Sequence, residues 1–154
     1  MSTRAMQLLT DKKITYEAVS YEDQVKGAKF ASEAMHFPLE RTIKTLVVEV
    51  GKKEYILALM PGDRQLSMKL LAKALTAKRA AMVDTDTAQR LTGYWVGGIS
   101  PFGTRQAMKV VMEQRLLEFD KVAVNGGQRG VMLIMDPRDI IRATQGLEAP
   151  LVQE

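Results

Sequence analysis

The composition of this 154-residue sequence excludes several chemistries. It contains no cysteine and a single histidine, His36. The absence of cysteine excludes disulfide bonds, a thiolate nucleophile and cysteine-based metal centres. One histidine cannot form a multi-histidine metal site, and any serine–histidine–aspartate triad would depend on it alone. His36 lies between Met35 and Phe37, which is typical of a packed or surface side chain. We therefore expect no metal and no cofactor.

Long apolar runs are also missing. The longest, such as residues 55–60, is far shorter than the roughly 18 residues that a membrane span needs, and residues 1–6 contain no apolar core of a signal peptide. We expect a cytoplasmic protein without membrane contact. Apolar residues make up 46% and charged residues 26%, as in a globular protein. The length predicts one domain over residues 1–154.

Positive charge is concentrated in the first two thirds of the chain. Residues 1–110 carry 17 basic and 11 acidic side chains, whereas residues 111–154 carry 5 and 7. Between positions 64 and 79 there is no acidic residue but five basic ones: Arg64, Lys69, Lys73, Lys78 and Arg79. Such a stretch indicates either a surface for a polyanion such as RNA or simply a solvated helix face.

The pattern of apolar and capping residues predicts alternating helices and strands. We expect helices over residues 3–12, 26–35, 67–75 and 84–91, a turn or short helix over 115–119, and a last helix that begins at Pro137. We expect strands over residues 15–21, 42–50, 54–60, 108–112, 121–124 and 131–135. Two hairpins are indicated, with turns at residues 51–53 and at Asn125-Gly126. This order predicts a single α/β domain with a mixed or antiparallel sheet rather than a Rossmann fold.

The common catalytic and phosphate-binding motifs, such as GxxxxGK[ST], HExxH and GxSxG, do not occur. Instead, residues 92–103 contain four glycines, one proline and the only tryptophan. A turn between strands would need one or two glycines. The adjacent Gly97-Gly98 exposes backbone amides without side chains, which favours close approach of a ligand oxygen. We therefore favour a binding groove formed by residues 94–100.

Two cations accompany this glycine-rich run. Lys44 enters a strand that is otherwise apolar, so it is either an edge residue that prevents aggregation or a cation held in a cleft for a phosphate or a carbonyl. Arg129 lies in the run of residues 125–130, near the end of a sheet, where the simpler interpretation is a longer hairpin loop.

At these positions the sequence resembles the YbaK/EbsC family of deacylases, related to the editing domain of bacterial prolyl-tRNA synthetase. The resemblance rests on three runs, residues 43–46, 89–103 and 126–130, and extends over nearly the whole chain. It implies a single α/β domain with a mixed, largely antiparallel, barrel-like sheet flanked by helices. It also implies hydrolysis of the ester of mischarged aminoacyl-tRNA, above all Cys-tRNA(Pro), with Ala or Ser as alternative amino acids. The partners would be tRNA and prolyl-tRNA synthetase.

The resemblance also assigns residues. Tyr21, Lys44 and Gly97 match positions of the family, and we expect catalysis from Lys44 with the backbone of Gly97 and Gly98. The expected substrate contacts are Tyr21, Thr45, Tyr94, Ile99, Ser100, Arg129 and Met132. The expected tRNA contacts are Lys69, Lys73 and Lys78. Two departures bear on amino-acid specificity: Met132 stands where relatives can carry aspartate, and residues 22–27 lack a His-Asp-Pro-Ala-like stretch.

The chemistry of an activated ester is compatible with so small a set of residues. One oxyanion donor lowers a barrier by roughly 3–4 kcal/mol, or about 10²–10³-fold in rate, and the proton acceptor would come from the substrate. Two other functions stay open at this point. The chain could be a non-catalytic tRNA- or synthetase-binding module, or an interaction protein anchored by Trp95 and Phe102.

Overall fold

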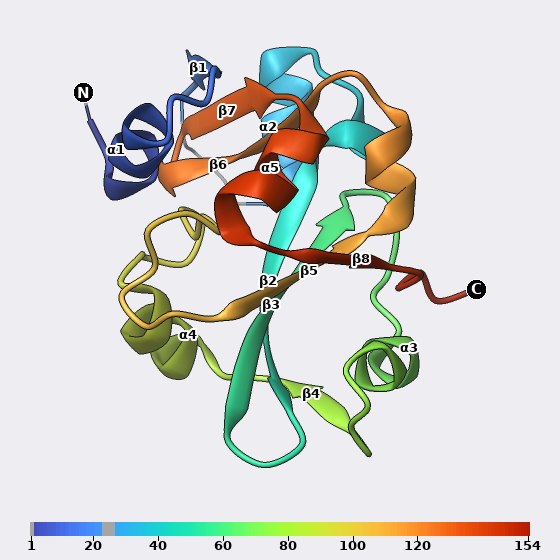
Figure 1. Ribbon diagram of the computed structural model, residues 1–154. Coiled ribbons are helices and arrows are strands. Elements are labelled where there is room, and N and C mark those ends of the chain that lie inside the picture. Colours follow the sequence, from blue (N-terminus) through green and yellow to red (C-terminus); the bar gives the residue numbers. More distant parts are fainter. Residues whose placement is uncertain (1, 23–26) are drawn as a thin grey trace.

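Two sheets form the framework of the computed structural model, which describes residues 2–22 and 27–154. The smaller sheet has the order β1-β7-β6 and the larger the order β4-β2-β3-β5-β8 (Figure 1). Their strands are β1 (Glu17–Ser20), β2 (Ile43–Val50), β3 (Glu54–Pro61), β4 (Ala80–Met82), β5 (Lys109–Glu113), β6 (Val122–Gln128), β7 (Val131–Met135) and β8 (Leu147–Ala149). The pairs β3–β5 and β5–β8 are parallel, and the other strand pairs are antiparallel.

This topology confirms the predicted α/β fold with a mixed, largely antiparallel sheet. The barrel does not close, however. The two sheets stay separate and are joined by an isolated parallel bridge between Thr42 and Ala123. The expected hairpin of β2 and β3 is confirmed, with Val50 paired to Glu54 across a short turn.

Helices cover the sheets and begin where the capping residues predict. They are α1 (Arg4–Asp11), α2 (Ala28–Met35), α3 (Met68–Ala74), α4 (Thr85–Thr92) and α5 (Pro137–Thr144), with 3-10 turns at Leu39–Arg41 and Gln114–Glu118. Four of them have a side-chain oxygen that accepts a hydrogen bond from a first-turn amide, as such caps do: Thr3, Ser67, Asp84 and Asp136. The expected start of α2 at Lys26 lies outside the described residues.

The predicted turn at Asn125-Gly126 is wrong. Strand β6 continues through both residues, and the register with β7 shifts between Asn125 and Gln128, which marks a β-bulge. Gln128 pairs with Val131, so the hairpin turns at Arg129-Gly130. A Cβ on Gly126 would lie 3.0 Å from the Val131 side chain. Packing of the two strands over this bulge, rather than the local turn preference of Asn-Gly, fixed the hairpin.

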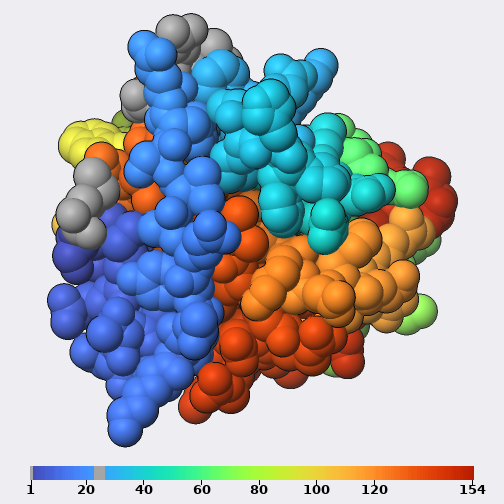
Figure 2. All heavy atoms as spheres, turned by 90° about the horizontal axis from the view of Figure 1, so that it is seen from above, coloured from blue at the N-terminus to red at the C-terminus, as the bar shows by residue number. Residues whose placement is uncertain are grey.

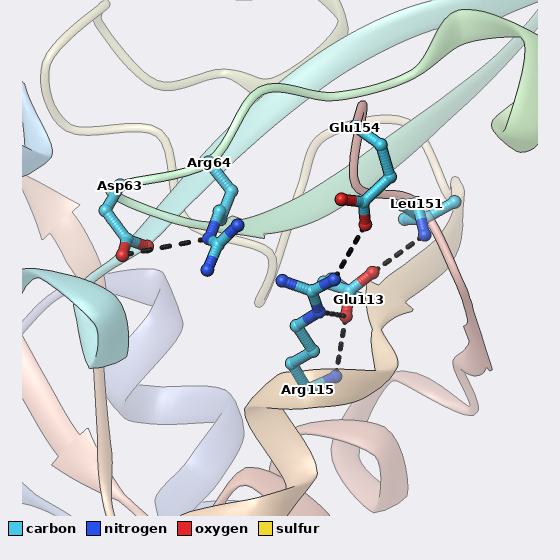
Figure 3. A network of polar contacts seen from close by, with 6 residues as sticks. All are labelled: Asp63, Arg64, Glu113, Arg115, Leu151 and Glu154. Carbon is cyan, nitrogen blue, oxygen red and sulfur yellow. Dashed lines mark hydrogen bonds and ion pairs between the residues drawn. The ribbon is translucent and has the colours of Figure 1, made fainter.

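The main core fills the space between one face of each sheet, where it also receives the apolar sides of α1, α4 and α5. A second core lies on the other face of the large sheet, beneath α3 and the C-terminal residues. Buried Glu113 fixes that C-terminal segment, because its carboxylate accepts hydrogen bonds from the amides of Leu151 and Arg115 at 2.7 Å each (Figure 3). A third, small core lies between α2 and the outer face of the small sheet.

One edge of β2 is only half covered. On that side β4 pairs with β2 over Val48 to Val50, the Val83 amide donates to the Val47 carbonyl at 3.3 Å, and the isolated bridge lies beyond, at Thr42. Among the described residues, no strand pairs with positions 43–46 on this edge. The space beside these positions forms the cavity described next. In the view from above, the blue residues that include β1 and α2 run beside the red-orange residues of the C-terminal third (Figure 2).

Candidate active site

A cavity of about 330 Å³ opens beside the N-terminal half of β2. Its wall comes from four parts of the chain: the end of β1 with the start of α2, strand β2, the glycine-rich loop, and the β6–β7 sheet. The residues that line it are Tyr21, Gly27, Ala28, Ala31, Ile43, Lys44, Thr45, Leu46, Val96, Gly97, Ile99, Asn125 and Met132. Of the groove expected over residues 94–100, Val96, Gly97 and Ile99 line this cavity.

Lys44 brings the cation of this wall. Its ammonium group donates a hydrogen bond to the carbonyl of Arg64, 2.5 Å away. Partial burial lowers the pKa of Lys44, and the carboxylate of Asp63 partly offsets this by favouring the charged form. Asp63 itself lies 3.9 Å from the side chain of Arg64 (Figure 3). The loop after β3 therefore holds the lysine beside the cavity.

Gly97 brings the backbone donor. It adopts a φ of +97°, a conformation that favours glycine. Its carbonyl accepts a hydrogen bond from Asn125 Nδ2 at 3.0 Å. Its amide N–H makes no hydrogen bond with the part of the chain that the structure describes. The wall thus contains a backbone N–H that can donate to a ligand.

Three side chains hold this loop in place. The guanidinium of Arg129 donates to the carbonyl of Val96 at 2.9 Å, and the Val96 amide donates to Gln89 Oε1 at 2.9 Å. Asn125 also accepts from the amide of Gly127 at 2.8 Å, so one side chain joins the β-bulge to the loop. Arg129, an expected substrate contact, is not part of the cavity wall and instead positions the residues that are.

Gly98 lies behind the wall. Its amide donates to the carbonyl of Trp95 at 2.8 Å, which closes a turn and uses the N–H that we expected to face the ligand. A Cβ at this position would lie 2.8 Å from the amide nitrogen of Arg129. Gly98 is therefore required where the loop crosses the β6–β7 hairpin, and its amide is not free for the expected oxyanion contact.

Tyr94 and Ser100 are also structural rather than part of the wall. Tyr94 is 5% exposed, its hydroxyl donates to the carbonyl of Phe102, and its ring packs 4.8 Å from the guanidinium of Arg4. The hydroxyl of buried Ser100 accepts from the amide of Phe102 at 3.2 Å. Both bonds close the loop between positions 94 and 102 from beneath.

The other expected contacts do meet at the cavity. All four of the others line it, two from strands and two from loops: Thr45, Met132, Tyr21 and Ile99. Thr45 has a buried hydroxyl oxygen with no hydrogen-bond partner among the described residues. Such a group costs free energy unless a ligand or water satisfies it. It is therefore a candidate contact for a polar group of the substrate.

Sequence reasoning missed Asn125 and the small residues of α2. The dipeptide Asn125-Gly126 predicts a hairpin turn, but the bulge turns the Asn125 side chain to Gly97. Gly27, Ala28 and Ala31 line the cavity because α2 packs over the small sheet. Alanines are ordinary helix residues, so no sequence signal could have indicated this contact.

None of the expected tRNA contacts lines the cavity. Lys69, Lys73 and Lys78 are all exposed, on α3 or just after it. Lys78 comes two residues before Ala80, which pairs with Val50 at the far end of β2. Since six residues of strand separate Lys44 from Val50, this end lies roughly 20 Å away. Figure 1 likewise shows α3 well below α2.

Metal-binding clusters and membrane spans are both absent from the described residues. No group of three or more histidine, aspartate or glutamate side chains within residues 2–22 and 27–154 could hold a metal ion. In the same ranges no helix is long and apolar enough to cross a bilayer.

The fold and the cavity define an α/β domain in which a strand lysine and a glycine line one small, largely apolar space, the glycine amide being unpaired among the described residues. The chain belongs to the aminoacyl-tRNA editing domain family, whose sequence model matches residues 22–143. This confirms the resemblance inferred from the three sequence runs.

Two curated relatives cover most of the chain. A protein of Enterococcus faecalis, named as a candidate Cys-tRNA(Pro)/Cys-tRNA(Cys) deacylase, EbsC, is 29% identical over 94% of this chain and 89% of its own length. The multifunctional Ser/Thr-tRNA deacylase ProXp-y of Escherichia coli K12 is 29% identical over 92% of this chain and 87% of its own. A proline–tRNA ligase of Fervidobacterium nodosum is 27% identical over 71% of this chain but only 19% of its own.

Solved structures show the same fold. One, described as a candidate trans-editing enzyme for prolyl-tRNA synthetase, superposes with a TM-score of 0.89 at 22% identity and covers 100% of this chain and 99% of its own. The hypothetical protein APE2540 gives a TM-score of 0.91 at 20% identity, over 98% of this chain and 100% of its own.

Proposed function

We propose that this protein hydrolyses the ester bond of mischarged aminoacyl-tRNA and does so in trans, as a separate chain. One observation carries this proposal: Lys44 and the unpaired amide of Gly97 line the same cavity. The two named deacylases that match nearly the whole chain support it. We expect the amino acid and its ester to enter this cavity.

Electrostatic stabilisation would supply most of the catalysis. When water attacks the ester carbonyl carbon, negative charge develops on the carbonyl oxygen. The Gly97 amide and the ammonium of Lys44 are donors that can stabilise this charge without reorganising. Collapse of the tetrahedral intermediate breaks the bond to the ribose oxygen and releases the free amino acid and the tRNA.

The two proton transfers are assigned to the substrate. Water loses one proton on attack, and the departing ribose oxygen takes one up. Among the described wall residues there is no carboxylate or imidazole, and protonated Lys44 cannot accept a proton. The neighbouring ribose hydroxyl can relay the proton. With a cysteine substrate, the thiol can instead attack its own ester, pass its proton to the ribose oxygen and leave a thiolactone for water to open.

The amino-acid specificity is a second part of the proposal. The wall beside Ala31, Ile43, Ile99 and Met132 is apolar, which fits a small side chain such as that of cysteine. Serine and threonine are the second candidates, and the partnerless hydroxyl of Thr45 favours them. A hydroxyl group makes a stronger hydrogen bond than a thiol. Prolyl-tRNA synthetase, which charges tRNA(Pro), is the proposed partner.

Single-turnover hydrolysis of Cys-, Ser-, Thr- and Ala-tRNA(Pro) tests the function, with the parent compared with Lys44→Ala. We expect the variant to lose at least about 10²-fold in rate, the scale of one transition-state donor. Its free energy of unfolding should change by less than about 1.5 kcal/mol, since one exposed hydrogen bond is removed. Lys52→Ala, at an exposed turn, is the control for charge and should match the parent.

The outcomes separate the alternatives. If the parent hydrolyses none of the four substrates, the chain is a binding module and not a deacylase. If Lys44→Ala hydrolyses at the parent rate, the lysine has no part in catalysis. The order of rates over the four amino acids assigns the specificity.

A further inference from the structure

The side chain of Trp95 is far more exposed to solvent than tryptophan side chains usually are in folded proteins. It is 78% exposed, more than the other two exposed large apolar residues of the described part of the chain, Met82 at 50% and Leu147 at 46%. No aromatic or cation–π contact involves it among the described residues. Tryptophan is highly buried on average. An indole left in solvent contributes little to folding, so its contribution is expected in a complex.

The residue directly precedes the cavity wall. Val96 and Gly97, the next two residues, both line the cavity. The backbone at Trp95 is also held in place, because its carbonyl accepts from the Gly98 amide and the adjoining Val96 amide donates to Gln89. Trp95 thus directly precedes two wall residues, on a loop whose backbone is held by hydrogen bonds.

A cation accompanies the indole. The exposed guanidinium of Arg129 donates to the carbonyl of Val96, one residue from Trp95. An aromatic face beside a cation is the combination with which proteins bind unpaired nucleotides, the ring stacking on a base and the cation meeting a phosphate. The exposed indole is not needed to hold the amino acid itself.

The size of the cavity indicates which part of an aminoacyl-tRNA can enter it. A space of about 330 Å³ lies near the lower limit of ligand cavities and accommodates an amino acid with its ester. The unpaired nucleotides that precede the ester must then remain outside, at the mouth. We propose that Trp95 is the stacking platform for an unpaired base at the 3′ end of the tRNA acceptor. This proposal rests on the proposed function and specifies how its site holds the nucleic acid.

The tryptophan also provides its own assay, since it is the only one in the chain. Intrinsic fluorescence reports on this indole alone. Uncharged tRNA, and separately the single-stranded trinucleotide of its 3′ end, should quench the emission in a saturable way. The same tRNA truncated by its unpaired 3′ nucleotides should not. Equal quenching by intact and truncated tRNA would overturn the proposal, as would no quenching by intact tRNA.

Kinetics with Trp95→Ala and Trp95→Phe complete the test. Loss of one stacked base weakens binding by about 5- to 100-fold. We expect the KM for aminoacyl-tRNA to rise by this factor in Trp95→Ala, with a smaller rise in Trp95→Phe, whose ring still stacks. Leu147→Ala, which removes an exposed apolar side chain on β8, is the matched control and should leave KM unchanged.

The two proposals fail in different ways. Hydrolysis by the parent with an unaltered KM in Trp95→Ala would refute the stacking platform and leave the deacylase intact. Saturable quenching by the 3′ trinucleotide without hydrolysis of any aminoacyl-tRNA would retain the platform and refute the deacylase. An unaltered KM together with self-association that Trp95→Ala abolishes would reassign the residue to a contact between copies of this chain.

Discussion

Replacing Gly98 by alanine tests the idea that the catalytic wall is positioned by backbone contact. The φ of Gly98 is not in the left-handed region, so alanine introduces no backbone strain there. The added methyl group would instead lie 2.8 Å from the Arg129 amide nitrogen and 3.0 Å from the carbonyl carbon of Gln128. Ordinary contacts begin near 3.4 Å, so the loop must move outward by about half an ångström.

Gly98→Ala should affect the free energy of unfolding and the rate of deacylation by different amounts. Overpacking of this kind costs roughly 1–3 kcal/mol, which lowers the melting temperature measurably. The displacement also moves Gly97, the neighbouring residue, away from its position in the cavity wall that Lys44 also lines. Because one misplaced donor costs about 10²-fold in rate, we expect single-turnover deacylation by the folded Gly98→Ala protein to fall by 10-fold or more.

Gly146→Ala is the matched control. It also adds a methyl group where φ is not left-handed, 3.0 Å from the Thr144 hydroxyl and 3.1 Å from the Val110 carbonyl oxygen, but outside the cavity wall. It should lower the melting temperature without changing the rate per folded molecule. If Gly98→Ala matched the parent in rate, or if Gly146→Ala slowed the reaction as much, backbone contact would not position the catalytic wall.

Two further predictions concern stability and tRNA affinity. Glu113→Ala leaves the buried Leu151 amide without its acceptor and should cost about 1–3 kcal/mol in a denaturant titration; deacylation by the folded fraction should not change, and an unchanged midpoint would contradict the structural role of this carboxylate. Neutralising the exposed lysines of the basic segment should weaken the binding of all tRNAs alike. It should also reduce the slope of log K against log salt by about 0.7–0.9 for each phosphate that is no longer neutralised. An unchanged slope would mean that these lysines form a solvated helix face and do not contact tRNA. The substitutions are Lys69→Ala, Lys73→Ala and Lys78→Ala combined.

Local interactions explain why much of the fold could be predicted. A helix cap joins a side chain to an amide two or three residues away, so Thr3, Ser67, Asp84 and Asp136 could be assigned from their immediate neighbours. The β2–β3 hairpin likewise follows from two β-rich runs and a short turn. Of the candidate site, Lys44, Gly97, Thr45 and Met132 could be named from the sequence, and all four line the cavity.

What the tertiary structure alone decided depends on contacts between distant segments. Whether a glycine faces a ligand or another backbone cannot be told from its neighbours, and Gly98 meets a strand hairpin about thirty residues further along the chain. From its place in the glycine-rich run, Tyr94 was expected to contact the substrate, but its ring packs against Arg4 from α1 and is buried. Asn125, followed by glycine, is typical of a hairpin turn. In the structure the β6–β7 register instead creates a bulge there, and the side-chain amide of Asn125 donates to the Gly97 carbonyl. The sequence thus determined the helices and the longer strands, but not the short strands β4 and β8, which form only by pairing with β2 and β5. It also determined the chemical groups of the site, and the packing of segments far apart in the chain decided which of those groups line the cavity.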